Sequence, residues 1–235
     1  MQLTFELVAK AGHIVADTGP SPGFVPMADR DYEALADELL ADRPLVGPLC
    51  VFAYGSLLWK PAFEASEERH AIAPGWHRTF RLKLSRWRGT PERPGLMLIL
   101  DRGGRCHGMV QSLPQGDIRG ALIALLRREM SSRTSTNRPR WILVDVEGVR
   151  TKAIAFCADR HGPAYAGRQP LAAVADVLAT AAGHAGSCAE YLLRTVDGLE
   201  QRGIRDRGLW QLQAMVAERI RTSIDSADGA AGVVP

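Results

Sequence analysis

Apolar and polar residues alternate over several short stretches in the middle of the chain, which is the pattern of half-buried β-strands. In residues 79–85, Phe80, Leu82 and Leu84 fall on one face and basic residues on the other. Other stretches are almost wholly apolar and predict buried strands. The predicted strands are residues 51–54, 71–74, 79–85, 96–100, 106–112, 141–146 and 151–157.

Turn residues join four of these strands into two predicted hairpins. Asp101–Gly104 separates residues 96–100 from 106–112, and Glu147–Gly148 lies between the last two strands. Gly and Asp suit the backbone conformations of tight turns. The Gly- and Pro-rich run Arg88–Gly95 is predicted to be a loop.

Apolar residues at helical spacing predict helices before, between and after the strands. The first begins at Asp29, with Asp29 or Asp31 as its N-cap, and ends before Pro44. The second has Ile118 and Leu125 on one face. The helices after the first are predicted at residues 117–129, 171–182, 189–201 and 206–222.

This order of elements predicts an α+β fold, because the strands come in runs and do not alternate regularly with helices. The hairpins favour a small mixed or antiparallel, barrel-like sheet flanked by helices. We expect three regions: 1–48 as an N-terminal extension with one helix, 49–224 as the main domain and 225–235 as a flexible tail. Residues 1–28 lack sustained periodicity, so we expect an extended linker whose removal leaves the core intact.

Composition narrows the classes of function. The 235 residues carry 29 basic and 26 acidic side chains, a net charge of +3, so there is no large single-sign field of the kind that nucleic-acid binders use. Arginine is concentrated in residues 78–93 and 127–140, either as a solvated face or as a rim that attracts anions. Nucleic-acid binding by the first group is disfavoured, because the apolar residues of that strand point away from the charges.

Cysteine and histidine spacing gives no sign of a metal site. The four Cys residues form no C-x-x-C pair, and the six His residues form no H-E-x-x-H motif. We therefore expect free or buried thiols and no metal. The N-terminus has no basic segment followed by an apolar one, and no apolar run approaches the ~20 residues of a membrane span, so a cytoplasmic protein is expected.

The most informative break in the pattern lies within Val51–Trp59. An apolar strand ends there at Gly55, a small polar residue, Ser56, follows, and the chain then becomes apolar again. A sharp turn at such a glycine can direct backbone N–H groups toward an anion. Taken alone, a strand followed by Gly-Ser is more often a simple turn.

Glu129 continues the apolar stripe of its predicted helix. It lies four residues after Leu125 and eleven after Ile118, so all three share nearly the same azimuth. Partial burial and the negative end of the helix should both raise its pKa, which suits a general acid and base. Arg127 and Arg128 fall on other faces and are expected to be poor partners for it. The alternative is a Glu that turns into solvent at the helix end.

The region Val51–Trp59 resembles the strand-and-loop signature of the ChaC-like γ-glutamylcyclotransferases. The likeness extends from about residue 51 to about residue 212 and leaves residues 1–48 uncovered. Five further blocks follow in the family's order: Pro74–Phe80, Arg88–Gly95, Gly103–Gly108, Arg127–Met130 and Glu190–Leu192.

The resemblance implies a small β-barrel flanked by helices and an enzyme that acts on a small-molecule substrate. It would convert glutathione, or a related γ-glutamyl compound, to 5-oxoproline and cysteinylglycine without a cofactor. The substrate's own α-amine would attack its δ-carbonyl, with Glu129 as general acid and base. The implied substrate-binding residues are Tyr54, Gly55, Ser56, Leu57, Arg88 and Tyr191.

Other interpretations stay open for several of these residues. Tyr54 is either a core aromatic or part of the pocket, Tyr191 either packs on the sheet or binds substrate, and Arg88 is either a surface residue or a partner for a substrate carboxylate. If Glu129 is only structural, the base would be Glu92 or Glu190.

One departure from the family concerns residues 131–137. The family often carries a Tyr after its Arg-Glu block, whereas this polar stretch has none. The rival function class is a non-catalytic binding or regulatory protein on the same fold, like a cation-transport regulator. Such a protein would have no need of Glu129 on a buried stripe.

Overall fold

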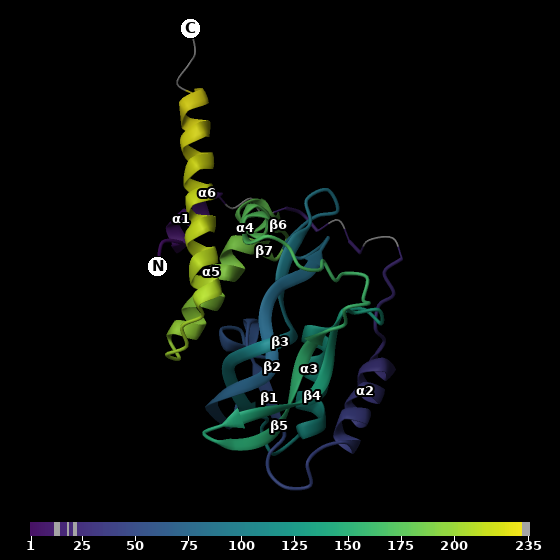
Figure 1. Cartoon of the computed structure of the whole chain (residues 1–235). Coiled ribbons are helices and arrows are strands. Elements are labelled where there is room, and N and C mark those ends of the chain that lie inside the picture. The colour runs from purple at the N-terminus through teal and green to yellow at the C-terminus, as the bar shows by residue number, and fades with distance from the viewer. Residues whose placement is uncertain (12–14, 18, 21–22, 232–235) are drawn as a thin grey trace. The chain divides into compact units, whose positions relative to one another are not determined.

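The computed structural model describes residues 1–11, 15–17, 19–20 and 23–231, with the backbone alone for 227–231. Its elements are labelled in Figure 1. The helices are α1 (Phe5–Ala11), α2 (Asp29–Ala41), the 3₁₀-helix η1 (Ser56–Leu58), α3 (Ile118–Glu129), α4 (Leu171–Thr180), α5 (Cys188–Glu200) and α6 (Arg207–Ala231). The strands are β1 (Cys50–Ala53), β2 (Glu67–Leu84), β3 (Gly95–Ser112), β4 (Asn137–Val146), β5 (Val149–Ala158) and the short pair β6 (Ala182–Gly183) and β7 (Gly186–Ser187).

Five strands close into a barrel in the order β1-β3-β2-β4-β5. The pairing is mixed, since β1 runs antiparallel to β3 and parallel to β5, with Val51 opposite Ile154. The largest fully buried side chains include Phe52, Phe156 and Ile154 from these strands. The α+β fold with a small mixed barrel is therefore confirmed.

The first predicted hairpin is wrong, whereas the second is confirmed. Asp101–Gly104 lies inside β3, which continues through Gly103 and Gly104 although their φ angles are +111° and +72°. Consecutive glycines at positive φ bend a strand without ending it, so their turn chemistry misleads. In the second hairpin, Glu147 and Gly148 both have positive φ and join β4 to β5 as a tight turn.

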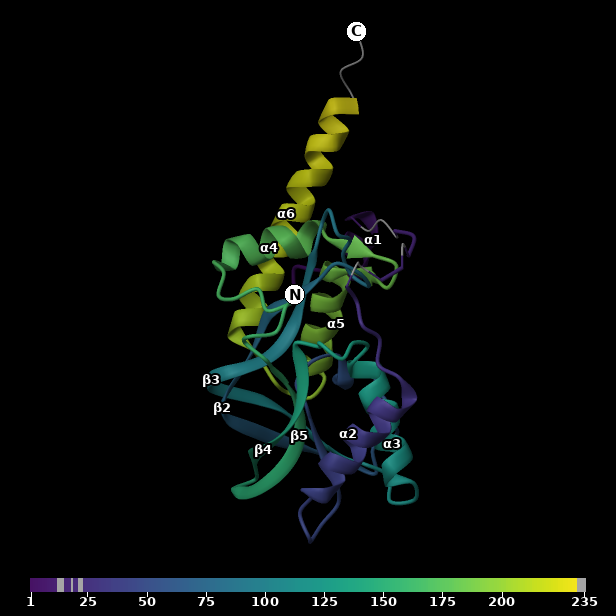
Figure 2. The same ribbon diagram turned by 90° about the vertical axis from the view of Figure 1, so that its right-hand side faces the viewer.

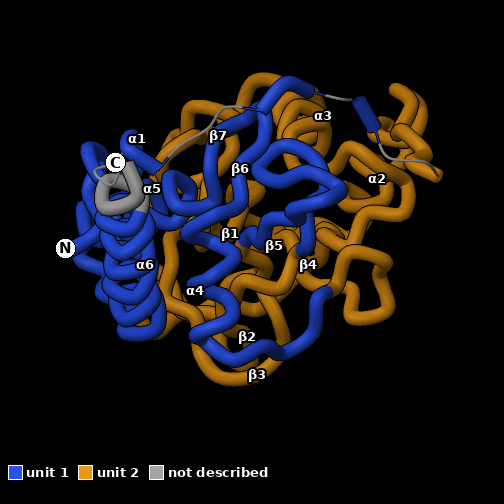
Figure 3. Tube along the Cα trace, turned by 90° about the horizontal axis from the view of Figure 1, so that it is seen from above, with its two compact units in different colours: residues 1–22, 83–97, 166–235 blue, residues 23–82, 98–165 orange. Residues whose placement is uncertain are grey.

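Two compact units divide the chain, and Figure 3 colours them blue and orange. Unit 1 consists of Met1–Pro22, Lys83–Met97 and Ala166–Pro235, and unit 2 of Gly23–Leu82 and Leu98–Tyr165. Residues 1–48 contain two helices, where the sequence predicted one. The boundaries predicted at 48 and 224 remain predictions, and they differ from the division into units.

In unit 1 the first residues of the chain are packed, so the expectation of a linker is wrong for residues 1–11. Leu3 is fully buried, and α1 contacts α5 and α6. The buried Gln213 of α6 accepts hydrogen bonds through Oε1 from the N–H groups of Gln2 and Leu3, at 2.9 and 2.8 Å. These contacts join residues more than 200 positions apart, so local periodicity cannot reveal them.

The end of the chain also departs from expectation. Helix α6 continues to Ala231, so the tail predicted from residue 225 is helical up to that point. Residues 232–235 lie outside the described part of the chain.

In unit 2, α2 lies beside α3, as Figure 2 shows. The Tyr32 hydroxyl donates to the carbonyl of Met130 at 2.8 Å, and Trp141 Nε1 of β4 donates to the carbonyl of Leu39 at 3.1 Å. The helix begins at Asp29 as predicted, but its N-cap is Ala28, and Asp31 accepts from the Ala28 N–H. Helix α2 is thus fastened to both α3 and β4.

Among the helices of the described residues, none is both long and apolar enough to cross a membrane.

Candidate active site

Three strands of unit 2 meet at one edge of the barrel. Because β1 and β5 are parallel with Val51 opposite Ile154, the residues that follow β1 come level with the end of β5. Strand β4 begins at the same edge, where Asn137 pairs with Ala158. The loop after β1, the end of β5 and the start of β4 therefore lie together.

The loop after β1 is the Gly55–Leu58 turn. The N–H groups of Leu58 and Trp59 donate back to the carbonyls of Gly55 and Ser56, at 3.0 and 3.2 Å. The first N–H groups of any helical turn have no partner within it, so those of Ser56 and Leu57 are free of the turn's own bonds. The Leu57 and Leu58 side chains are buried and anchor the loop. That these N–H groups bind an anion stays a prediction.

Tyr54 is held firmly at the start of this loop. Its side chain is 8% exposed, its hydroxyl donates to the Phe156 carbonyl of β5 at 2.7 Å, and its ring stacks on Phe52. The Tyr54 carbonyl accepts from Arg78 Nη1 at 2.7 Å. These contacts favour the interpretation of Tyr54 as a core aromatic that positions the loop.

Arg78 does not lie on a solvated face, contrary to the simpler interpretation of the arginine-rich strand. It is 8% exposed and donates to the carbonyls of Tyr54 and His107. Its guanidinium therefore places a positive charge directly behind the Gly55–Leu58 loop.

Glu129 is the last residue of α3, and its side chain is 16% exposed. Burial raises its pKa above the ordinary 4.5, and the nearby charge of Arg128 opposes that rise without cancelling it. The predicted burial and the raised pKa are thus confirmed. A carboxyl with a raised pKa can accept and return a proton near neutral pH.

The prediction that Arg128 is a poor partner for Glu129 is wrong. Arg128 Nε lies 3.4 Å from Glu129 Oε1, and Arg128 Nη2 donates to Ser56 Oγ at 3.3 Å. Neighbouring helix positions diverge by about 100°, but a long arginine side chain can curl back at the helix end, where no further turn blocks it. Arg128 therefore links the end of α3 to the loop after β1.

The structure thus brings Glu129, Gly55, Ser56, Leu57 and Tyr54 to one edge of unit 2. Spacing on the helix pointed to Glu129, and the glycine break pointed to the loop. Nothing in the sequence pattern pointed to Arg128 as the connection between them.

The other two predicted residues, Arg88 and Tyr191, contact each other within unit 1. Arg88 is largely buried, and its Nη1 donates to Ser187 O at 2.7 Å and to Glu190 Oε2 at 3.0 Å. Its guanidinium lies 5.6 Å from the centre of the Tyr191 ring, and Tyr191 is 3% exposed. The surface interpretation of Arg88 is therefore wrong, and the contacts favour packing for Tyr191.

The two alternative bases fit the chemistry less well than Glu129. Burial opposes ionisation of Glu190, but hydrogen bonds from Arg194 and Arg88 outweigh it and hold its pKa below the ordinary value. Glu92 is exposed in the loop between β2 and β3. A carboxylate that is already ionised and paired is a poor proton carrier near neutrality.

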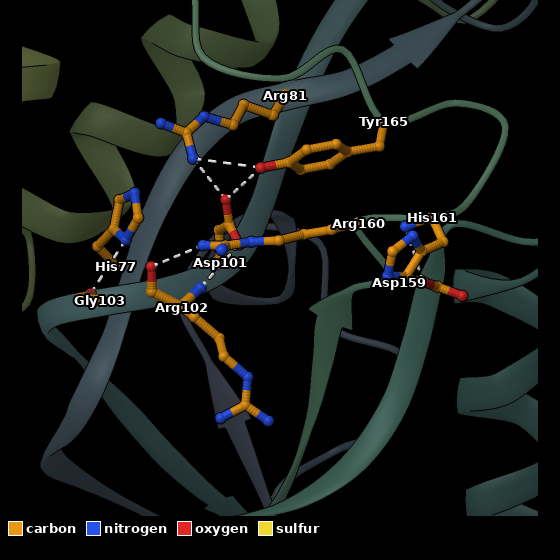
Figure 4. Close-up of polar contacts among 9 residues, drawn as sticks. All are labelled: His77, Arg81, Asp101, Arg102, Gly103, Asp159, Arg160, His161 and Tyr165. Atoms are coloured by element: carbon orange, nitrogen blue, oxygen red, sulfur yellow. Dashed lines mark hydrogen bonds and ion pairs between the residues drawn. The ribbon is translucent and has the colours of Figure 1, made fainter.

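A second polar cluster in unit 2 surrounds Asp101, which is 1% exposed (Figure 4). Burial opposes its ionisation, but hydrogen bonds from Arg160, Tyr165, the Arg102 N–H and Arg81 outweigh it and lower its pKa to about 2. Both carboxylate oxygens are occupied by these donors. We interpret Asp101 as an anchor that ties the segment after β5 to β3, and sequence spacing gave no sign of it.

Comparison with known proteins places this geometry in context. A family model described as ChaC-like protein matches residues 49–219. The chain is 39% identical over 178 residues to the glutathione-specific γ-glutamylcyclotransferase of Escherichia coli (strain K12), covering 75% of this chain and 76% of that protein. It is 30% identical over 158 residues to glutathione-specific γ-glutamylcyclotransferase 1 of Homo sapiens, covering 66% and 71%.

A solved structure shares the fold. The crystal structure of the γ-glutamyl cyclotransferase specific to glutathione from yeast superposes with a TM-score of 0.66 at 20% sequence identity. The match covers 74% of this chain and 97% of the yeast chain.

Proposed function

Because the chain belongs to the ChaC-like protein family, we propose that it is a γ-glutamylcyclotransferase that converts glutathione to 5-oxoproline and cysteinylglycine. The glutathione-specific enzymes among its relatives support the substrate, and the buried carboxyl at the barrel edge supports the chemistry.

The reaction needs no nucleophile from the protein. The α-amine of the γ-glutamyl group attacks the δ-carbonyl, a C–N bond closes the five-membered ring, and the amide bond to cysteine breaks. Glu129 takes the proton from the attacking amine and returns it to the leaving amine, so no water is consumed. Holding the substrate folded is itself a large part of the catalysis, because well-oriented intramolecular attack reaches effective molarities of about 10⁵ M and above.

The observation that carries this proposal is the environment of Glu129. Burial raises its pKa, while Arg128 limits the rise and, through Ser56, keeps the carboxyl beside the loop after β1. The backbone N–H groups of Gly55, Ser56 and Leu57 would hold the substrate carboxylate or the oxyanion of the tetrahedral intermediate. Arg78, behind this loop, makes the potential there more favourable for an anion.

Arg88 and Tyr191 remain proposed substrate contacts on the family resemblance alone. The bonds that they make in their own unit already account for their burial. Their first role, in our interpretation, is to stabilise the start of α5.

The direct test is incubation of the purified protein with glutathione, followed by mass spectrometry of the products. We expect 5-oxoproline and cysteinylglycine in equal amounts from the parent protein, and release at least about 10²-fold slower from the Glu129→Gln variant. If glutathione and simple γ-glutamyl dipeptides all stay intact, the enzyme proposal is wrong. Binding of glutathione without turnover would favour the regulatory alternative.

We further propose the cytoplasm as the compartment. All four cysteines are free and buried, as is usual for proteins kept in reducing surroundings. Fractionation of cells that express a tagged copy would test the assignment.

A further inference from the structure

Asn137 is the first residue of β4 and lies at the same edge of unit 2 as Glu129. It pairs with Ala158 at the end of β5, which is level with the loop after β1. Helix α3 ends at Glu129, and only the short segment of residues 130–136 separates it from β4. Arg128 ties the end of α3 to Ser56 in that loop. Both ends of the segment 130–136 are therefore fixed at the proposed active site.

The Asn137 side chain is more than nine-tenths buried, and its Oδ1 atom has no hydrogen-bond partner among the described residues. Its backbone is satisfied, since the N–H donates to Ser135 Oγ at 3.2 Å and the carbonyl accepts from the same hydroxyl at 3.0 Å. A buried acceptor without a donor destabilises a fold, so native proteins seldom keep one that has no task.

The neighbouring residue Thr136 shows that a buried side-chain oxygen in this segment can find a hydrogen-bond donor. Within residues 131–137, the polar stretch that lacks the family's tyrosine, the two buried residues are Thr136 and Asn137. Thr136 Oγ1 accepts from the Ala164 N–H at 3.0 Å. Asn137 Oδ1 is the acceptor that the described protein leaves open beside the catalytic edge.

We infer that Asn137 Oδ1 accepts a hydrogen bond from the α-amino group of the bound γ-glutamyl substrate. The inference rests on the proposed function, in which that amine is the attacking atom and gives a proton to Glu129. A second acceptor at the same edge would hold another N–H of the amine and so orient its lone pair toward the δ-carbonyl. Asn137 would then position the substrate, whereas Glu129 alone would transfer the proton.

The test compares two ligands in a protein that cannot turn them over. One ligand is glutathione, and the other is glutaryl-cysteinylglycine, which is glutathione without its α-amino group. Calorimetric affinities are measured for Glu129→Gln and for the double variant Glu129→Gln, Asn137→Leu. Leucine is close to asparagine in shape and has no acceptor.

We expect the double variant to bind glutathione at least about 10-fold more weakly than Glu129→Gln, because hydrogen bonds to charged donors are among the stronger ones. Both proteins should bind glutaryl-cysteinylglycine equally. Asn137→Asp, which keeps an acceptor in place, should retain glutathione binding. Equal loss for both ligands, or loss for neither, would overturn the inference.

A thermal melt of Asn137→Leu separates a contact with substrate from a structural role. Removing an unpaired buried acceptor should leave the melting temperature equal or raise it. A lower melting temperature would show that Oδ1 serves the fold and would overturn the inference. Formation of 5-oxoproline by the parent protein tests the proposed function separately, so the inference can fail while the function stands.

Discussion

At the scale of single residues, Glu129 shows how helix position and environment combine. The spacing from Ile118 and Leu125 predicted its burial, and the structure confirms the burial and the raised pKa. Neither Arg128 nor Asn137 was predictable in the same way. Arg128 reaches Glu129 through the flexibility of a long side chain, and Asn137 comes to the edge only through pairing of β4 with β5.

Replacing Glu129 by Gln should lower kcat for 5-oxoproline release by about 10²–10⁴, because a positioned acid–base contributes that much and Gln carries no proton. The same substitution should not lower the stability of the protein, although it lowers the activity. The pKa of Glu129 is higher in the folded protein than in the unfolded chain. Protonation of Glu129 therefore stabilises the fold fully below about pH 4.5, and this stabilisation is lost as the pH rises through the raised pKa. At pH 7, which is above the ordinary 4.5, the parent has lost at least part of this stability, so Glu129→Gln should melt at an equal or higher temperature.

The matched control is Glu92→Gln, which removes an exposed carboxyl from the loop between β2 and β3. Its kcat and melting temperature should both stay close to those of the parent. A Glu129→Gln variant with kcat within about threefold of the parent would remove Glu129 from the mechanism.

At the scale of elements, the sequence identified most helices and the second hairpin but misjudged how the long strands continue. Gly103 and Gly104 carry the composition of a turn, yet β3 runs through them because it is paired on either side of them, at Leu100 with β5 and at Met109–Ser112 with β1. Tertiary pairing, which is not local, overrides the turn preference. The same reason explains why α1 was missed, since seven residues form a stable helix only when other elements cover them.

Asp101 ties the segment after β5 to β3, and its lowered pKa should make the stability of the protein depend on pH. Its folded-state pKa of about 2 lies below the ordinary 3.8, so its contribution to stability is present above about pH 4 and is lost as the pH falls toward 2. The shift corresponds to ~2 kcal/mol. Asp101→Asn should therefore lower the melting temperature at pH 7, and its deficit relative to the parent should shrink between pH 4 and pH 2. A deficit that does not change with pH would contradict the assigned pKa.

The burial of Leu3, just before α1, can be tested by mutation. Leu3 is fully buried, so Leu3→Ala should lower the free energy of unfolding of the part that contains it by about 2–5 kcal/mol. Urea denaturation measures the change. Glu6→Ala, at an exposed position in the nearby helix α1, should change it by about 0.5 kcal/mol at most. Equal behaviour of the two variants would mean that the burial of Leu3 does not contribute to stability.

At the scale of the whole molecule, the proposed cyclisation requires a substrate with a free α-amine, because that amine is the attacking atom. N-acetylglutathione has its amine blocked, so we expect no release of 5-oxoproline or cysteinylglycine from it. Glutathione in the same assay is the control. Comparable cleavage of the acetylated compound would mean that water or a protein group is the nucleophile.

The assignment of chain segments to units was beyond sequence reasoning. Unit 1 is built from three stretches that are far apart in the sequence, and the first stretch contacts the last through α1 and through the hydrogen bonds of Gln213 with Gln2 and Leu3. Periodicity reports which face of an element is buried but not which distant segment buries it.

The bond between Leu3 and Gln213 also has a consequence during protein synthesis, since the two residues are 210 positions apart. At a translation speed of ~5–20 residues per second, the ribosome needs roughly 10–40 s to make the stretch between them. Throughout that interval the Leu3 N–H lacks its Gln213 acceptor, and α1 lacks the part of α6 that it contacts in the finished fold. A message that ends before α6 is translated would release a chain whose first helix lacks α6, one of the two helices that it contacts.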